Sequence, residues 1–309
     1  MRSGFVTIIG RPNAGKSTLL NALVGEKLAI VTAKPQTTRN RIQGIINRPR
    51  AGHSHAAQIV LIDTPGVHRP DTSLDKKMMR EVRDALDGCD LILLITDVTD
   101  KPGAGEKFVL DLVRKARAPA FLLLNKIDRI EKSRLLAIIE RWRQLYDFKE
   151  IVPISALKRN GLDRLLDAVV EALPEGQPYF PPDQITDQPQ RFLVAETIRE
   201  QVLLATKEEV PYAATVLIEE FEEKPKVTRI AAVIYCEREG QKAILIGKGG
   251  LMLKQIGTRA RLEIEPMLGK KVFLELFVKV RPGWRDSREF VEGLDWRRQL
   301  EEMAGREQE

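Results

Sequence analysis

The feature that most constrains the fold is the pattern G-x-x-x-x-G-K-S, which spans residues 10–17. An apolar run, 5–9, precedes it, and an apolar-periodic segment that suits a helix follows it. A strand, a glycine-rich turn and a helix are the context in which this pattern binds phosphate groups. Backbone N–H groups then point inward at a helix N-terminus, where the helix dipole favours an anion. We therefore expect Lys16 to contact the β- and γ-phosphates of a nucleotide and Ser17 to bind Mg²⁺.

Up to residue 174, apolar runs alternate with segments of helical period. The run 91–95 is apolar on both faces, as a central strand covered by helices should be. This alternation predicts an α/β fold with a mostly parallel sheet, helices on both faces, and ligands at the carboxyl ends of the strands. Strands are expected at 5–9, 42–47, 58–62, 91–96, 119–124 and 150–154, and helices at 16–24, 74–87, 104–117, 131–146 and 161–172.

The length of 309 residues suits two domains, and a proline-rich stretch marks the boundary. Four prolines between residues 173 and 184 forbid a continuing helix and indicate a semi-rigid linker. We expect a first domain at 1–174, a linker at 175–190, a second domain at 191–285 and an acidic tail at 286–309.

Neither a membrane span nor a disulfide is expected. No apolar run approaches the roughly 18 residues that cross a bilayer, and the N-terminus enters a strand without a signal peptide. Cys89 and Cys236 fall in different domains, which favours free thiols and a reducing compartment. His53 and His55 form H-x-H without a third ligand in view, so we expect a solvated loop there.

Two segments after the first helix, 34–39 and 63–66, are expected to contact Mg²⁺ and the γ-phosphate, and we call them the sensor loops. Residues 34–39, K-P-Q-T-T-R, form a polar loop in which an ordered threonine would bind Mg²⁺, and we favour Thr38 over Thr37. Residues 63–66, D-T-P-G, end a strand. A carboxylate there holds Mg²⁺, usually through water, and the Gly66 N–H contacts the γ-phosphate because no Cβ blocks its approach.

The sequence N-K-I-D at 125–128 follows another expected strand. The Asp128 carboxylate can accept two N–H donors from the edge of guanine, whereas adenine presents no such pair. Charge-assisted hydrogen bonds of this kind are worth about 1.5–3 kcal/mol each, which makes the site selective. The segment 155–158, S-A-L-K, ends the last strand and would supply a backbone N–H to guanine O6.

The five segments resemble the signature boxes of the Ras-like, translation-factor class of GTPases, in that family's order. The resemblance implies GTP and GDP binding with Mg²⁺ at Ser17, Thr38 and Asp63, and catalytic roles for Lys16, Thr38 and Gly66. It implies nucleotide contacts from Gly10, Asn13, Ala14, Gly15, Lys16, Ser17, Thr18, Asp63, Thr64, Pro65, Gly66, Asn125, Lys126, Asp128, Ser155, Ala156 and Leu157.

One position departs from that family. Val67 stands where Ras-type enzymes carry a glutamine that orients the attacking water, so we expect slow intrinsic hydrolysis. His68 is next and could contact the switch region, although a solvent-facing loop histidine is the simpler interpretation.

The second domain has the predicted order helix, strand, strand, helix, helix, strand. It carries G-x-x-G at 247–250, within a segment, 241–285, that holds ten basic and three acidic side chains. A basic face in an otherwise acidic domain suits a polyanion. The pattern resembles an α+β type II KH domain, which binds single-stranded RNA. The expected RNA-binding residues are Ile244, Ile246, Gly247, Lys248, Gly249, Gly250, Leu253 and Lys254.

The two domains together resemble the Era family of bacterial ribosome-assembly GTPases, from residue 5 to about 285. The family implies binding to the 3′ end region of 16S rRNA, a role in 30S subunit biogenesis, a cytoplasmic location with peripheral contact to the inner membrane face, and a monomer. Two alternatives stay open. One is an RNA-binding protein with a structural nucleotide that is hardly turned over. The other, a tRNA-modification GTPase, is disfavoured because no cysteine follows Cys236.

Overall fold

The computed structural model describes residues 1–49, 56–100 and 103–299. The chain divides into two compact units. The first comprises Met1–Arg69 and Met78–Asp187, and the second comprises Pro70–Lys77 and Gln188–Glu309. The later division falls inside the proline-rich segment 175–190. His53 and His55 lie outside the described residues.

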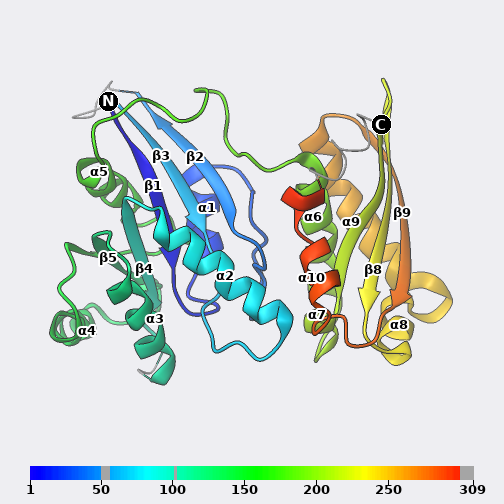
Figure 1. Cartoon of the computed structure of the whole chain (residues 1–309), viewed down its shortest axis with the longest axis horizontal. Coiled ribbons are helices and arrows are strands. Elements are labelled where there is room, and N and C mark those ends of the chain that lie inside the picture. The colour runs from blue at the N-terminus through cyan, green and yellow to red at the C-terminus, as the bar shows by residue number, and fades with distance from the viewer. Residues whose placement is uncertain (50–55, 101–102, 300–309) are drawn as a thin grey trace. The chain divides into compact units, whose positions relative to one another are not determined.

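The first unit is built on a six-stranded sheet. Its strands are β1 Arg2–Ile9, β2 Ile42–Arg48, β3 Ala57–Asp63, β4 Leu91–Asp97, β5 Ala120–Asn125 and β6 Glu150–Pro153. Their order in the sheet is β2-β3-β1-β4-β5-β6 (Figure 1). Strand β2 runs antiparallel to β3, and the other neighbours are parallel. All residues of β3, β4 and β5 are buried, which explains why these segments are apolar on both faces.

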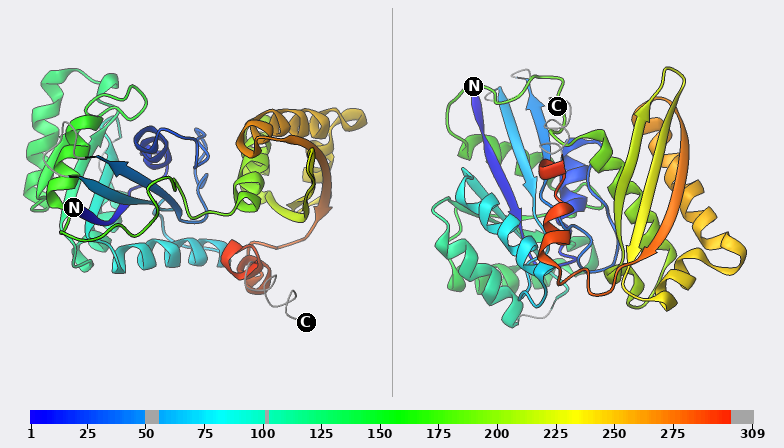
Figure 2. Two further views of the ribbon diagram at one scale, coloured as in Figure 1. Left: turned by 90° about the horizontal axis from the view of Figure 1, so that it is seen from above. Right: turned by 45° about the vertical axis from the view of Figure 1, so that its right-hand side comes forward.

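Helices cover both faces of this sheet (Figure 2). They are α1 Lys16–Val24, α2 Ser73–Asp87, α3 Ala104–Lys115, α4 Lys132–Leu145 and α5 Leu162–Ala172. A short turn of 3₁₀ helix, η1 Ile127–Arg129, follows β5. One apolar cluster joins the sheet to α1 and α5 through residues such as Leu19 and Leu165. A second cluster joins the opposite face to α2, α3 and α4 through Val82, Val113 and Trp142. The mostly parallel α/β architecture expected for the first domain is confirmed.

The second unit packs its helices against one three-stranded sheet. Its elements are α6 Gln190–Ala205, α7 Val210–Ala213, β7 Thr215–Glu223, β8 Val227–Cys236, α8 Glu239–Ile246, η2 Lys248–Gly250, α9 Leu251–Leu268, β9 Lys271–Val280 and α10 Arg288–Gly293. The sheet has the order β7-β8-β9, in which β8 pairs antiparallel with β7 and parallel with β9. The core joins β8 to α6, α8 and α9 through buried side chains that include Ile234, Ile198, Leu245 and Ile256.

The order expected for the second domain is confirmed, with a short helix, α7, added before the first strand. The described part of the tail is not one continuous helix, because the helical conformation is interrupted at residues 294 and 295. Helix α10 ends at Gly293, and residues beyond 299 lie outside the described ranges. The ring of Trp284 is fully buried, and its indole N–H donates to the carbonyl of Ala213 at 2.8 Å, so Trp284 belongs to the domain core and not to an RNA surface.

Cys89 and Cys236 are both free cysteines, as expected. Among the helices that the structure describes, none is long and apolar enough to cross a membrane.

Candidate functional site

The loop between β1 and α1 has the tight conformation that phosphate binding needs. Gly15 has a φ of 102°, and a Cβ added there would lie 2.3 Å from the side-chain nitrogen of Asn125. Only glycine fits such a position, because L-residues disfavour positive φ and a side chain would collide with Asn125. Helix α1 begins at the next residue, Lys16, so its free N–H groups face the loop.

Lys16 is 5% exposed, and its ammonium donates to the carbonyl oxygens of Gly10 at 3.1 Å and Arg11 at 2.9 Å. Burial lowers the pKa of Lys16 to about 8, while the nearby Asp63 carboxylate opposes this change. The side chain is therefore mostly cationic at neutral pH, and it presents a charge at the phosphate end of the site.

Three oxygen-bearing side chains from separate segments meet beside Lys16. The Ser17 hydroxyl lies 2.8 Å from the Thr38 hydroxyl and donates to a carboxylate oxygen of Asp63 at 2.6 Å. Burial raises the pKa of Asp63 to about 6, although Lys16 and hydrogen bonds pull it down. The other oxygen of Asp63, Oδ1, is buried and has no hydrogen-bond partner among the described residues. Hydroxyl and carboxylate oxygens, one of them unsatisfied, fit a Mg²⁺ ion.

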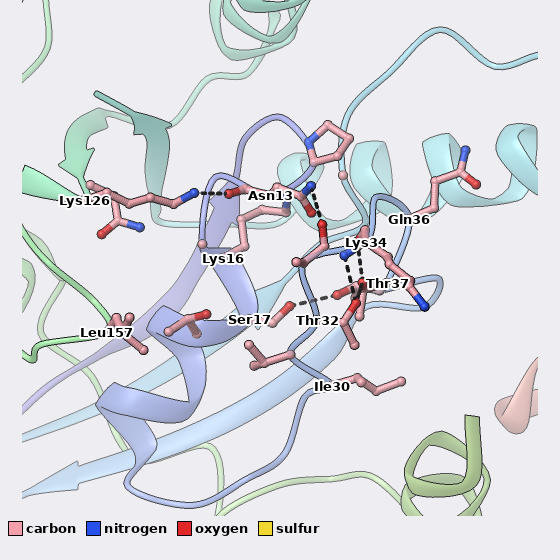
Figure 3. Close-up of a pocket in the computed structure, with 18 of the residues that line it drawn as sticks. Asn13, Lys16, Ser17, Ile30, Thr32, Lys34, Gln36, Thr37, Lys126 and Leu157 are labelled. Atoms are coloured by element: carbon pink, nitrogen blue, oxygen red, sulfur yellow. Dashed lines mark hydrogen bonds between the residues drawn. The ribbon is translucent and has the colours of Figure 1, made fainter. Parts of the chain in front are cut away.

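Thr37 and Thr38 have different surroundings. The Thr37 hydroxyl donates to the carbonyl of Lys34 at 2.7 Å and contacts the Thr32 hydroxyl, within its own loop (Figure 3). The Thr38 side chain is buried against Ser17. The structure thus places Thr38, the residue that the sequence favoured, beside the other two expected Mg²⁺ ligands.

Asn125 joins the opposite end of the site to the phosphate loop. Its side-chain nitrogen donates to the carbonyl of Ala14 at 2.8 Å, and its oxygen accepts from the Ala156 N–H at 3.0 Å. Lys126 donates to the carbonyl of Asn13 at 2.8 Å. Asp128 is exposed, and a hydrogen bond from Ser155 lowers the pKa of its carboxyl. Its charge is therefore available for a ligand.

A cavity of about 450 Å³ connects the two ends. Figure 3 shows its lining, with Asn13, Lys16 and Ser17 on one side and Lys126 and Leu157 near the base end. The sequence analysis did not predict that residues 30–33, just before the expected loop 34–39, also line the cavity. The segment 30–33 is tied to the phosphate loop, since the Asn13 side chain donates to the carbonyl of Ala33 at 3.0 Å.

Some residues that were expected to contact the nucleotide do not line this cavity. The Thr64 hydroxyl instead donates to the carbonyl of Ile8 at 2.8 Å, which fixes the end of β3 to β1. Asp63 is not part of the cavity lining, but its carboxylate accepts a hydrogen bond from Ser17, which is. The expected residues outside the lining are Gly10, Ala14, Asp63, Thr64, Pro65 and Ala156.

The simpler interpretation of the sequence was that the His68 ring faces solvent, but in the structure the ring has hydrogen-bond partners. The ring is partly buried, its Nδ1 lies 3.0 Å from the carbonyl oxygen of Gly66, and its Nε2 lies 3.0 Å from the side-chain nitrogen of Gln36. The simpler, solvent-facing interpretation was wrong, and the alternative contact with the switch region is the one that the structure shows.

The second unit has its own candidate surface, at the turn between α8 and α9. Gly247 has a φ of 72°, and a Cβ there would lie 2.7 Å from the Cβ of Met252, so only glycine suits this turn. Lys248 and Gly249 are exposed, and Ile244 is 48% exposed. The turn therefore leaves its backbone open to a ligand.

A groove of about 300 Å³ lies beside this turn. Of the expected RNA-binding residues, Gly250, Leu253 and Lys254 line it. Ile244, Ile246, Gly247, Lys248 and Gly249 do not. The sequence analysis did not predict five further lining residues, which are Gly257, Thr258 and Arg261 on α9 and Leu274 and Leu276 on β9. Helical spacing could have indicated those on α9, because residues three and four positions apart lie on the same face of a helix.

The fold and the site together define a P-loop GTPase that carries a KH domain. A family model described as a 50S ribosome-binding GTPase matches residues 5–126, and a KH-domain model matches residues 209–285. GTPase Era of Geobacter metallireducens is 50% identical over 297 residues, which cover 96% of this chain and 98% of the relative. GTPase Era of Heliobacterium modesticaldum is 44% identical over 302 residues, 97% of this chain and 99% of the relative.

The solved structures agree. A variant of Aquifex aeolicus Era bound to GDP.AlF4- superposes with a TM-score of 0.90 at 41% identity, over 94% of this chain and 98% of that one. The same values hold for Era in complex with MgGDPNP and nucleotides 1506–1542 of 16S ribosomal RNA. The chain belongs to the Era family of GTPases, and it is a GTP hydrolase.

Proposed function

We propose that this GTPase is a slow, Mg²⁺-dependent switch that binds 16S rRNA through its KH domain and acts in 30S ribosomal subunit biogenesis. The proposal depends on one observation, which is that the Ser17 hydroxyl is hydrogen bonded both to the Thr38 hydroxyl and to the Asp63 carboxylate. Thr38 belongs to a loop, whereas Ser17 belongs to the phosphate-binding helix. The position of the loop therefore depends on what binds at the phosphate site, which is the requirement for a switch.

Ser17, Thr38 and Asp63 are the residues that would hold Mg²⁺, and the unsatisfied Asp63 oxygen supports this assignment. The ion would neutralise charge on the β- and γ-phosphate oxygens. Lys16 contributes a second positive charge at the same place, since its ammonium is positioned by the carbonyls of the loop. Gly66 lines the cavity, which supports a contact between its N–H and the γ-phosphate.

The rate of hydrolysis is expected to be low. The side chain of Val67 is 2% exposed and packs in the apolar core, so it cannot hold a water molecule for attack. Intrinsic hydrolysis rates of GTPases of this class are on the order of 10⁻⁴ to 10⁻² s⁻¹. Such a rate suits a timed switch.

The base end supports selection of guanine. Asp128 can accept two hydrogen bonds from guanine, while Asn125 and Lys126 hold the base end to the phosphate loop. GTP and GDP are therefore the proposed ligands.

The RNA assignment rests on the G-x-x-G turn and the groove beside it. Lys248, Lys254 and Arg261 supply positive charge for phosphates, while Leu253 and Leu276 supply an apolar wall for bases. The relative solved with RNA, which carries nucleotides 1506–1542 of 16S rRNA, supports the 3′ end region as the target. A cytoplasmic location, peripheral contact with the inner membrane face and a monomeric state are further proposals, which rest on the family resemblance.

Crosslinking to total cellular RNA, followed by sequencing of the trapped fragments, tests the target. Enrichment of the 3′ end region of 16S rRNA is the expected result. Enrichment of tRNA or of mRNA, without 16S rRNA, would contradict the proposal. A variant with aspartates at Lys248 and Gly249 controls for contacts that do not involve the KH turn.

A further inference from the structure

Val67 cannot supply the polar group that orients water in Ras-type enzymes. Its side chain belongs to the apolar cluster that contains Ile9, Val82 and Leu86, and its backbone N–H donates to the carbonyl of Gly10 at 3.1 Å. The position is thus used to fix the sensor loop to the phosphate loop. If this loop provides a polar side chain near the γ-phosphate end of the site, that side chain must belong to a residue next to Val67.

The next residue, His68, contacts both sensor loops. Its Nδ1 faces the Gly66 carbonyl oxygen at 3.0 Å, and its Nε2 faces the Gln36 amide nitrogen at 3.0 Å. A carbonyl oxygen only accepts, so Nδ1 carries the hydrogen and donates. The amide nitrogen only donates, so Nε2 accepts. The ring therefore has a hydrogen-bond partner on each of the two loops.

Gln36 is held in an unusual backbone conformation. Its φ is 56°, in the left-handed region that residues with a Cβ disfavour. Gln36 precedes Thr38 by two residues and lines the nucleotide cavity together with Gly66. The loop is therefore fixed by interactions at this position, and the contact with His68 is one of them.

We propose that His68 is a positioning residue, which ties the Thr38 loop to the Gly66 loop so that both close on the γ-phosphate together. The proposal rests on the proposed roles of Thr38 and Gly66. His68 acts through these residues and need not touch the nucleotide. The link matters in the GTP state, because GDP has no γ-phosphate for either loop to contact.

The test measures single-turnover GTP hydrolysis at saturating GTP, GDP affinity and thermal stability for a set of variants. His68→Ala and Gln36→Ala should each slow hydrolysis by about tenfold, because small misplacements at a reacting centre are costly. For His68→Ala, whose side chain is not part of the cavity lining, GDP affinity and melting temperature should stay close to those of the parent protein. The double variant should be no slower than the slower single variant, since both changes break one link.

Two isosteres separate the contacts. His68→Asn keeps a donor near the position of Nδ1, and His68→Gln keeps a polar group near the position of Nε2. The link needs both contacts, so both variants should be slow. Arg69→Ala, at the exposed next residue, is the matched control and should hydrolyse GTP at the parent rate.

Parent-like hydrolysis in His68→Ala, full activity in His68→Asn, or a double variant slowed by the product of the two single effects would overturn the proposal. Thr38→Ala separates this failure from failure of the proposed switch. If Thr38→Ala hydrolyses GTP slowly while His68→Ala is normal, only the link is wrong. If Thr38→Ala is also normal, the proposed role of the Thr38 loop is wrong.

Discussion

The side chain of Asn125 donates to the carbonyl of Ala14 at 2.8 Å, and this bond joins the base end of the nucleotide site to the phosphate loop. Asn125 is 2% exposed, and its oxygen accepts from the Ala156 N–H. One buried amide thus holds three loops that come from distant parts of the sequence.

Asn125→Ala should weaken both nucleotide binding and the fold. The loss of two buried hydrogen bonds costs about 2 kcal/mol, which corresponds to about 30-fold in GDP affinity if the loops loosen. Calorimetric GDP binding and thermal unfolding measure the two effects. Asn160→Ala, at an exposed position of the loop after β6, is the control. If Asn125→Ala and Asn160→Ala had the same GDP affinity and melting temperature, the bridging role of Asn125 would be contradicted.

Asp128→Asn should change the base that the site selects. The amide cannot accept both guanine donors, so GTP affinity should fall by about a hundredfold, whereas xanthosine nucleotides should bind better than GTP. Competition between labelled GDP and unlabelled GTP or XTP measures the preference. Unchanged GTP affinity would show that Asp128 does not contact the base.

Mg²⁺ dependence should vary with pH because of Asp63. Burial raises the pKa of its carboxyl to about 6, so the group is ionised above that pH and protonated below it. Since Mg²⁺ needs the carboxylate, its contribution to nucleotide affinity should be full near pH 8 and fall by up to about tenfold per pH unit below 6. Nucleotide titrations with Mg²⁺ and with EDTA at several pH values measure this contribution of Mg²⁺ to nucleotide affinity. Asp63→Asn should weaken the pH dependence, because only the titration of the terminal phosphate of the nucleotide then remains. A variant with the same pH dependence as the parent protein would contradict the assignment.

Aspartates at Lys248 and Gly249 should abolish RNA binding and leave GDP affinity intact. The change reverses charge at an exposed turn that RNA phosphates would approach. Fluorescence anisotropy with a 16S rRNA 3′ fragment measures it. Lys226→Asp, at the exposed turn between β7 and β8, reverses one charge away from the groove, as Lys248→Asp does at the G-x-x-G turn, and should retain binding. Normal binding in the double aspartate variant would place the RNA surface elsewhere.

The sequence predicted the parts of the molecule that depend on local patterns. Apolar runs marked β3, β4 and β5 because these strands are buried on both faces. The G-x-x-x-x-G-K-S pattern identified the loop before α1, since Gly15 has a positive φ that only glycine adopts readily.

The features that the sequence did not predict depend on contacts between distant segments. Nothing local places Ala33 beside Asn13, or His68 between Gly66 and Gln36. Trp284 also gave no local sign of its burial, because its partner, Ala213, lies far away in the chain. Loop conformations and such pairings are set by tertiary packing, and periodicity carries no information on them.

The proposed switch requires that nucleotide state and RNA binding are coupled in this protein. Single-turnover GTP hydrolysis, measured with and without the 16S rRNA 3′ fragment at saturating concentration, tests it most directly. We predict that the fragment changes the hydrolysis rate and that the aspartate variant at Lys248 and Gly249 shows no change. An identical rate with and without RNA, together with equal RNA affinity in GDP and in a GTP analogue, would contradict the claim.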